Sequence, residues 1–391
     1  MKGRTFGTLS RRLRIADGVR LRREHFGGTI FDRRTGTTLD VDRRVFRGLE
    51  KLQNHGVLSD DALGQALRGR KISEHKLAKA RDIVSQLVDL AILDTATAAN
   101  VEASTSTVTS DSELADPADE CWPRGPHLTA PVTAHWGVTY RCSSSCPECY
   151  ARRYSHEFPD ELTLPQAKRL VTVLAEWGIF ELSIGGGEPL EYPLLPAIVR
   201  EARRQGLVVH VTTGQHHVSA VQLAKLADGI TGLQIGVKAD RFLANTSREV
   251  ANLAQTARLA AERGMHIGAN LVLSKQTLPH FERLLKILQQ AGLTRVTLLR
   301  YKPPADAAEW RRSKPSLKTL QEFERRLPAF VKRYAEMDVR LDCALSFLQR
   351  HLEPAEALAQ GIRGCVAGDR ILAITPDGSA FPCSQLVHPR F

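Results

Sequence analysis

The chain has 391 residues, of which 42% are hydrophobic and 6% aromatic, as is typical of a globular protein with two or three domains and a sizeable core. No run approaches the ~20 apolar residues of a membrane span, and no apolar stretch follows the basic amino terminus, so we expect a cytoplasmic protein with no membrane partner. The formal charge of +11 fits an anionic partner, either nucleic acid or an acidic peptide, and fits a merely solvated basic surface equally well.

The first predicted unit spans residues 1–93 and has three short strands followed by three helices. Turn signals at Gly27-Gly28 and Gly36 separate runs with β character. These runs lie at residues 17–24, 26–31 and 37–39. Capping residues (Asp40 or Asp42, then Ser59, then Ser73) precede apolar residues at helical spacing. This order predicts a small winged-helix-like α+β domain.

Residues 94–130 are predicted to form a flexible linker. The segment is rich in Ala, Ser and Thr, then acidic, then rich in Pro, and it has almost no large apolar side chain. Cys121 lies inside this linker, so we expect it to be a bystander.

Residues 131–345 alternate between strand and helix patterns. Strands are predicted at residues 132–138, 180–184, 207–212, 232–237, 266–273 and 295–300. Helices are predicted between them, at 164–177, 194–205, 218–227, 246–263 and 278–290. Six β/α units predict an α/β fold with a parallel sheet curled into a partial (β/α)6 barrel, with functional residues at the carboxyl ends of the strands.

Three cysteines follow the first of these strands closely. Cys142, Cys146 and Cys149 are spaced three and then two residues apart. Thiolates are soft ligands that select iron–sulfur clusters or zinc. Three thiolates cannot fill the four corners of a [4Fe–4S] cluster, so one iron would remain open, and a structural zinc site would need a second cysteine pair that the chain lacks. The odd total of seven cysteines argues against a secreted disulfide framework.

The pattern Cys-x3-Cys-x2-Cys followed by an aromatic residue resembles the radical S-adenosylmethionine (SAM) enzymes. The resemblance implies that Cys142, Cys146 and Cys149 hold a [4Fe–4S] cluster and that Tyr150 lies beside the adenine of SAM. In that family, the reduced cluster cleaves SAM into methionine and a 5′-deoxyadenosyl radical, which abstracts hydrogen from the substrate. The alternative is three structural or zinc-bound cysteines.

A glycine-rich turn follows the second predicted strand of this region. The residues are Gly185-Gly186-Gly187-Glu188-Pro189. In radical SAM enzymes the Gly-Gly-Glu-Pro motif holds the amino group of SAM, which implies that role for Gly186, Gly187 and Glu188. Without the cysteine motif one β/α unit earlier, such a strand end would usually be only a turn.

The third and fourth strands depart from the family pattern. Thr213 stands where relatives read Ser/Thr-Thr-Asn-Gly near the ribose of SAM, but the asparagine is missing. Gly236 and Lys238 replace a commonly found serine and aspartate. Lys238 is a candidate for binding a carboxylate of SAM or of a peptide; the alternative is a lysine that faces water.

Asn270 and Arg300, on the fifth and sixth strands, complete the mouth of the predicted barrel. An arginine at a strand end suits bidentate carboxylate binding, and in peptide-modifying relatives it faces the SAM carboxylate or the substrate. His216 and His217 are predicted to be loop residues rather than ligands. The sequence singles out no catalytic acid–base pair.

The last segment, residues 346–391, contains Cys365-x12-Gly378-x4-Cys383 around a predicted hairpin. It resembles the opening half of the SPASM/twitch extension, which carries auxiliary iron–sulfur clusters. Cys343 is a possible third ligand, although its place on an apolar stretch predicted as a strand (339–347) also fits a core residue. Three possibilities stay open: no auxiliary cluster, a cluster completed by another ligand, or a truncated extension.

Residues 18–52 resemble, more weakly, the PqqD-like peptide-recognition domain of systems that modify ribosomal peptides. In that family a leader peptide adds a strand to the edge of the sheet. The competing interpretation is a DNA-binding winged helix, which Arg43, Arg44 and Arg47 would suit.

Together these resemblances predict a maturase, similar to the mycofactocin maturases, that cross-links, epimerises or decarboxylates a precursor peptide. Its cofactors would be a [4Fe–4S] cluster and SAM, and an auxiliary iron–sulfur cluster is the further candidate. Its partners would be the leader of the precursor, bound by the amino-terminal domain, and a reductant protein of the flavodoxin or ferredoxin type. The alternatives are a radical SAM enzyme acting on a small molecule or tetrapyrrole, and an iron–sulfur sensor bound to DNA.

Overall fold

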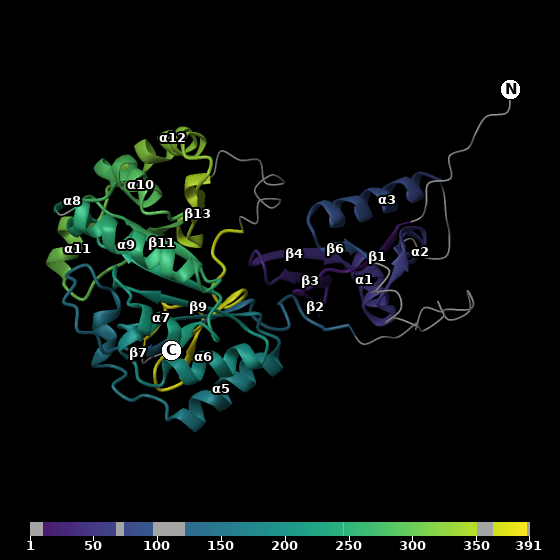
Figure 1. Cartoon of the computed structure of the whole chain (residues 1–391), viewed down its shortest axis with the longest axis horizontal. Helices are drawn as coiled ribbons and strands as arrows, with labels where there is room; N and C mark the ends of the chain where they lie inside the picture. Colours follow the sequence, from purple (N-terminus) through teal and green to yellow (C-terminus); the bar gives the residue numbers. More distant parts are fainter. Residues whose placement is uncertain (1–10, 68–73, 97–121, 245, 350–362, 389–391) are drawn as a thin grey trace. The chain divides into compact units, whose positions relative to one another are not determined.

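The computed structural model describes residues 11–67, 74–96, 122–244, 246–349 and 363–388. The chain divides into two compact units, Met1–Thr129 and Ala130–Phe391, which are coloured purple to blue and blue to yellow in Figure 1. Within the described ranges, no helix is both long enough and apolar enough to cross a membrane.

The described residues of the first unit form two small antiparallel sheets and three helices. One sheet has the order β2 (Val19–Glu24), β3 (Gly27–Asp32) and β4 (Thr37–Asp42). The other has the order β5 (Leu58–Ser59), β1 (Arg12–Ile15) and β6 (Leu93–Thr95). The helices are α1 (Arg43–His55), α2 (Asp60–Ala66) and α3 (Glu74–Asp89).

The core of this unit lies between its sheets and helix α1. Asp42 begins α1, because its side chain accepts hydrogen bonds from the backbone N–H groups of Arg44 and Val45 (both 2.9 Å). Leu49 and Leu52 of α1 are fully buried. Gly28 lets strand and helix approach closely, since a Cβ at that position would lie 1.8 Å from the Phe46 ring.

The described residues that end the first unit contact its arginines. The ring of Trp122 lies edge-on to Phe46, with centroids 6.1 Å apart. The guanidinium groups of Arg23, Arg43 and Arg47 lie over the Trp122 ring at 5.0, 5.1 and 5.6 Å. The carboxyl end of the stretch predicted as a linker is therefore in contact with β2 and α1.

The second unit is built on a nine-stranded sheet. Its order is β13-β12-β11-β10-β9-β8-β7-β14-β15. The strands are β7 (Thr133–Thr139), β8 (Glu181–Gly186), β9 (Val208–Thr213), β10 (Gly232–Val237), β11 (His266–Leu273), β12 (Arg295–Arg300), β13 (Asp338–Leu341), β14 (Ile371–Ile374) and β15 (Ala380–Phe381). All neighbouring pairs are parallel except β14 and β15. The six predicted strands are present, each within two residues of its predicted ends, and the predicted parallel sheet is confirmed.

Helices connect these strands and cover the outer face of the sheet (Figure 1). They are α5 (Leu164–Trp177), α6 (Leu195–Arg204), α7 (Ala220–Leu226), α8 (Ala239–Ala244), α9 (Thr246–Ala261), α10 (Phe281–Gln290), α11 (Ala307–Ser313) and α12 (Leu317–Arg333). Short 3-10 helices occur at η2 (Ala151–Ser155), η3 (Pro189–Glu191), η4 (Leu278–His280) and η5 (Cys343–Gln349).

Side chains alternate between the two faces of this sheet. The residues packed under the helices are apolar and almost fully buried: Ala134, Trp136, Val138, Leu182, Ile184, Val209, Val211, Leu233, Ile235, Ala269, Leu271, Val296 and Leu298. The residues on the inner face are small or polar: His135, Gly137, Ser183, Gly185, Thr212, Gly236 and Asn270. One cavity touches strands from β7 to β12, so the sheet curves around it.

The predicted strand at residues 339–347 is wrong in its second half. Strand β13 ends at Leu341, and Cys343 opens the 3-10 helix η5. The reason is Asp342, whose backbone carbonyl accepts from Leu345 N (2.7 Å) and whose side chain accepts from Ala344 N (3.3 Å). These two bonds turn the chain out of the sheet.

The carboxyl-terminal segment adds two strands to the free edge of β7. Strand β14 runs parallel to β7, with Ile371 opposite Thr133 and Ile374 opposite Trp136. Strand β15 folds back antiparallel to β14. Residues after β15 thereby reach the cavity beside the strand that leads into the cysteine loop.

Candidate active site

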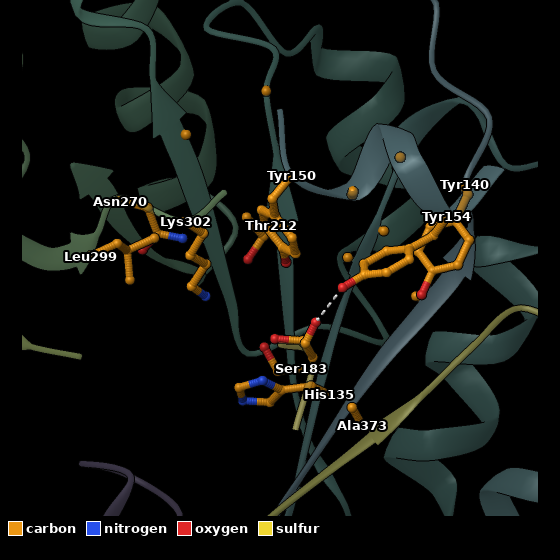
Figure 2. A pocket seen from close by; sticks show the side chains of 18 of the residues that line it. His135, Tyr140, Tyr150, Tyr154, Ser183, Thr212, Asn270, Leu299, Lys302 and Ala373 are labelled. Carbon is orange, nitrogen blue, oxygen red and sulfur yellow. Dashed lines mark hydrogen bonds between the residues drawn. The ribbon is translucent and has the colours of Figure 1, made fainter. Parts of the chain in front are cut away.

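A cavity of about 350 Å³ opens at the carboxyl ends of the parallel strands (Figure 2). Six residues predicted to bind SAM line it: Tyr150, Gly186, Gly187, Thr213, Asn270 and Arg300. Glu188 and Lys238 lie directly behind the lining residue Gly214. The structure therefore brings all eight predicted SAM-binding residues to one end of the sheet, where parallel α/β sheets place their functional residues.

The cysteine loop leaves β7 and stays close to the surface. Cys142 is exposed, whereas Cys146 and Cys149 are half-buried. Ser143 anchors the loop by donating its backbone N–H to Glu191 Oε2 (3.0 Å). Burial raises the pKa of the Cys149 thiol, and the nearby Cys146 and Cys142 raise it further.

No three His, Cys, Asp or Glu side chains of the described residues converge into a preformed metal cage. The three thiols nevertheless share one short loop and influence each other electrostatically. This donor set fits a cluster that takes three thiolates and leaves one iron open.

The glycine pair Gly186 and Gly187 packs against the start of the cysteine loop. Gly186 has a φ of +116°, and a Cβ there would lie 2.2 Å from Thr139 O. A Cβ on Gly187 would lie 2.0 Å from Arg141 O. Gly187 N donates to Thr139 O (2.7 Å). Only glycine fits this contact, so the glycine turn and the cysteine loop form one unit.

Glu188 is held as a buried hydrogen-bond acceptor, with 3% of its surface exposed. Its carboxylate accepts from Thr213 Oγ1 (2.7 Å), Gly214 N (3.0 Å) and Leu190 N (3.1 Å). Burial raises the pKa of Glu188, against the lowering effect of these bonds. The carboxylate thus faces the end of β9 in a fixed position.

Lys238 lies across Gly214 from Glu188. Its Nζ donates to Ser144 Oγ of the cysteine loop (3.4 Å). A Cβ on Gly214 would lie 3.5 Å from Lys238 Nζ and 3.7 Å from Glu188 Oε2. A cation and an anion therefore both lie beside Gly214, and the ammonium and carboxylate groups of an amino acid would require charges of these two signs.

His216 is not an ordinary loop residue. It is 5% exposed, and its ring nitrogens lie 2.5 Å from Glu249 Oε2 and 3.1 Å from Gly236 O. It therefore braces the inner strand β10 against helix α9. The sequence pattern gave no sign of this role, because Glu249 lies 33 residues away on another element.

Further residues line the cavity that the sequence did not single out, among them His135, Glu148, Ser183 and Lys302. Figure 2 shows the Lys302 ammonium and the His135 ring turned into this cavity, with Asn270 near Lys302 and Ser183 beside His135. The pKa of His135 is lowered to about 4, first by burial and then by the charge of Lys302. The alternation of apolar and polar residues along β7 was the signal that could have placed His135 inward.

Two of the candidate auxiliary ligands lie near each other. The pKa of Cys343 is raised to about 11 by burial, by Asp342 and by Cys365. The backbone of Val366 acts on the pKa of Cys343 in the opposite direction. Cys383 accepts a hydrogen bond from Gln385 N (3.5 Å), and the residue after it, Ser384, lines the cavity.

Comparisons with known proteins agree with this geometry. Residues 136–288 match the model of the Radical SAM superfamily. The chain is 26% identical to the PqqA peptide cyclase of Ruegeria pomeroyi over 269 residues, which cover 66% of this chain and 69% of the relative. It is 26% identical to the mycofactocin maturase MftC of Mycobacterium ulcerans over 275 residues, which cover 68% and 71%.

Among solved structures, Streptococcus suis SuiB bound to S-adenosylmethionine is similar in fold. The TM-score is 0.65 at 17% identity, over 97% of this chain and 84% of SuiB. Residues 136–288 are thus similar to the Radical SAM superfamily, and the named relatives show that the chain is an enzyme. Its cofactors are a [4Fe–4S] cluster and SAM.

Proposed function

We propose that this enzyme is a maturase that modifies a ribosomally made precursor peptide by cross-linking, epimerisation or decarboxylation. The observation that carries the proposal is the joint placement of the cysteine loop, the glycine turn and the Glu188–Lys238 pair around one cavity. Support for a peptide substrate comes from relatives named for peptide cyclisation and mycofactocin maturation, and from a structure of SuiB bound to precursor peptide SuiA.

Different residues of the proposed site would bind the cluster and the separate parts of SAM. Cys142, Cys146 and Cys149 would hold the cluster, and Glu188 and Lys238 would take the amino and carboxylate groups of SAM. Gly186 and Gly187 would let the backbone approach SAM, with Thr213 near its ribose and Tyr150 near its adenine. When bound, the reduced cluster supplies the electron for cleavage of SAM into methionine and a 5′-deoxyadenosyl radical.

The amino-terminal unit is proposed to bind the leader of the precursor. Its three-stranded sheet β2-β3-β4 has two edge strands, and an extended peptide can add a strand to such an edge. The DNA-binding alternative relied on Arg43, Arg44 and Arg47, and two of them, Arg43 and Arg47, lie over the Trp122 ring. That contact favours the peptide hypothesis.

The proposal is tested first without a substrate. The anaerobically reconstituted chain is given SAM and dithionite, and 5′-deoxyadenosine is quantified. We expect product from the wild type and none from Cys149→Ala. A fully loaded cluster that yields no 5′-deoxyadenosine would reject the maturase, and salt-dependent DNA binding would then support the sensor.

The substrate is tested second, with a short peptide encoded beside the chain's own gene. A mass change in that peptide, dependent on SAM, is the expected result. Cleavage of SAM without any modified peptide, together with turnover of a tetrapyrrole or another small molecule, would favour the small-molecule alternative.

The same preparation tests the auxiliary cluster. Cys343, Cys365 and Cys383 are proposed as its cysteine ligands, with a fourth ligand of another kind. About four irons per chain indicate a single cluster, whereas about eight indicate a second one. Loss of iron in Cys365→Ala with retained SAM cleavage would assign that residue to the second cluster.

A further inference from the structure

Three cationic side chains of the described residues lie in or beside the cavity, and only one of them is proposed to bind SAM. Lys238 lies with Glu188 beside Gly214, whereas Arg300 and Lys302 line the cavity itself. Neither Arg300 nor Lys302 forms an ion pair with a carboxylate of the described residues. One carboxylate, Glu148, also lines the cavity, so these two cations outnumber the lining carboxylate by one.

Lys302 is placed to act on a ligand. Its Nζ lies 5.0 Å from the centre of the Tyr150 ring, so an aromatic face supports the ammonium from one side. Asn270, Ser183 and His135 are polar residues that line the cavity with it (Figure 2). These three side chains can each donate a hydrogen bond.

The charge state of His135 follows from the same arrangement. Burial and the nearby Lys302 hold the pKa of His135 at about 4, so the ring is neutral at pH 7. Asp342 acts in the opposite direction but is the smaller influence. A neutral imidazole adds a hydrogen-bond donor to the cavity without adding a further positive charge.

A partly buried ammonium is stabilised when a carboxylate accepts its hydrogen bonds, and neutral donors nearby then stabilise that carboxylate. We propose that Lys302 and Arg300, together with the donors around them, bind a carboxylate of the peptide substrate. The residue that the enzyme modifies is then an acidic residue, a neighbour of one, or the carboxyl-terminal residue. This inference rests on the proposed function, because it takes the SAM carboxylate to be bound by Lys238.

The inference is tested by direct binding, because turnover of the unidentified substrate is not required. The probes are acetyl-Gly-Glu-Gly-amide, its neutral isostere acetyl-Gly-Gln-Gly-amide, and acetyl-Gly-Gly-Gly with a free carboxyl terminus. Their dissociation constants are measured by anaerobic equilibrium dialysis against the full reconstituted chain with saturating SAM. The two acids distinguish a side-chain carboxylate from a terminal one.

We expect at least one acidic probe to bind about tenfold more tightly than the neutral probe. Lys302→Met should abolish this preference, and Lys302→Arg should retain most of it. The matched control is Lys314→Met, because Lys314 also lies over an aromatic ring, that of Trp310 at 5.7 Å, but does not line the cavity. This variant should bind all probes as the wild type does.

Equal binding of acidic and neutral probes, no detectable binding of either acid, or a preference that survives Lys302→Met would overturn the inference. So would a weakened affinity for SAM in Lys302→Met, which would assign Lys302 to the cofactor. Formation of 5′-deoxyadenosine by the wild-type protein is measured in parallel. It separates failure of this inference from failure of the proposed function.

Discussion

The two faces of the nine-stranded sheet differ sharply although the same strands form both. Outward residues such as Trp136 and Leu271 are at most 1% exposed and pack under helices. Their inward neighbours His135 and Asn270 line the cavity and contribute little to the core. Along each strand, alternate residues thus have different roles: outward side chains stabilise the fold, and inward side chains line the cavity. Substitutions at adjacent positions should therefore have effects of different kinds.

The largest loss of activity is expected from a substitution in the cysteine loop, which follows strand β7. Cys149→Ala removes one of three thiolates, so the cluster should be lost and 5′-deoxyadenosine formation should fall at least ~10³-fold. Iron content and the anaerobic cleavage assay measure this. Cys121→Ala is the matched control and should keep both; normal activity of Cys149→Ala would refute the cluster assignment.

The next largest effect is a loss of stability, which should differ between neighbouring residues on the two faces of the sheet. Leu271→Ala empties a fully buried outward position and should lower the free energy of unfolding by about 2–5 kcal/mol. Asn270→Ala changes the inward neighbour and should cost less than ~1 kcal/mol while weakening the site. Urea denaturation followed by circular dichroism compares them. Similar losses in the two variants would contradict the division between faces.

A smaller effect is expected at the glycine turn. Gly187→Ala places a methyl group against Arg141 O, so it should cost about 1–3 kcal/mol and weaken SAM binding. Gly185→Ala is the control for stability, because its methyl group would meet no protein atom within 4 Å. Melting temperatures and SAM dissociation constants test this. A Gly187→Ala protein as stable as Gly185→Ala would show that the backbone contact is not tight.

The smallest expected effect is a pH-dependent change in stability caused by Glu181, the first residue of β8. Burial raises its pKa from 4.5 to about 7, with Arg340 and Arg295 acting in the opposite direction. The folded protein holds this proton to higher pH than the unfolded chain, so the contribution of Glu181 to stability is full below pH ~4.5 and is lost as pH rises toward ~7. Glu181→Gln should therefore be about 1–2 kcal/mol more stable than the wild type at pH 8, and no more stable at pH 4.

Urea denaturation at both pH values measures this difference, with the exposed Glu176→Gln as control. An equal stability difference at both pH values would show that Glu181 does not titrate in this range.

The sequence predicted the parts of the site that depend on local order. Strand ends, the cysteine loop and the glycine turn all follow from short-range patterns, because parallel strands gather their carboxyl ends at one edge. It missed Lys302 and Ser183, since their approach depends on the curvature of the sheet. Cys343 was misplaced on a strand, because a hydrogen bond of Asp342 with the next turn overrides the apolar pattern.

Strand β14 pairs with β7 although the paired residues Thr133 and Ile371 are ~240 positions apart in the chain. During synthesis, β7 and the cysteine loop that follows it are made about 240 residues before β14 can cover this edge. Such distant pairings form late and slowly in folding. The hydrogen-bonding edge of β7 is therefore open to pairing with other nascent chains until residue 374 has left the ribosome. Folding yield should then fall more steeply with expression rate for this enzyme than for proteins whose sheet edges close locally.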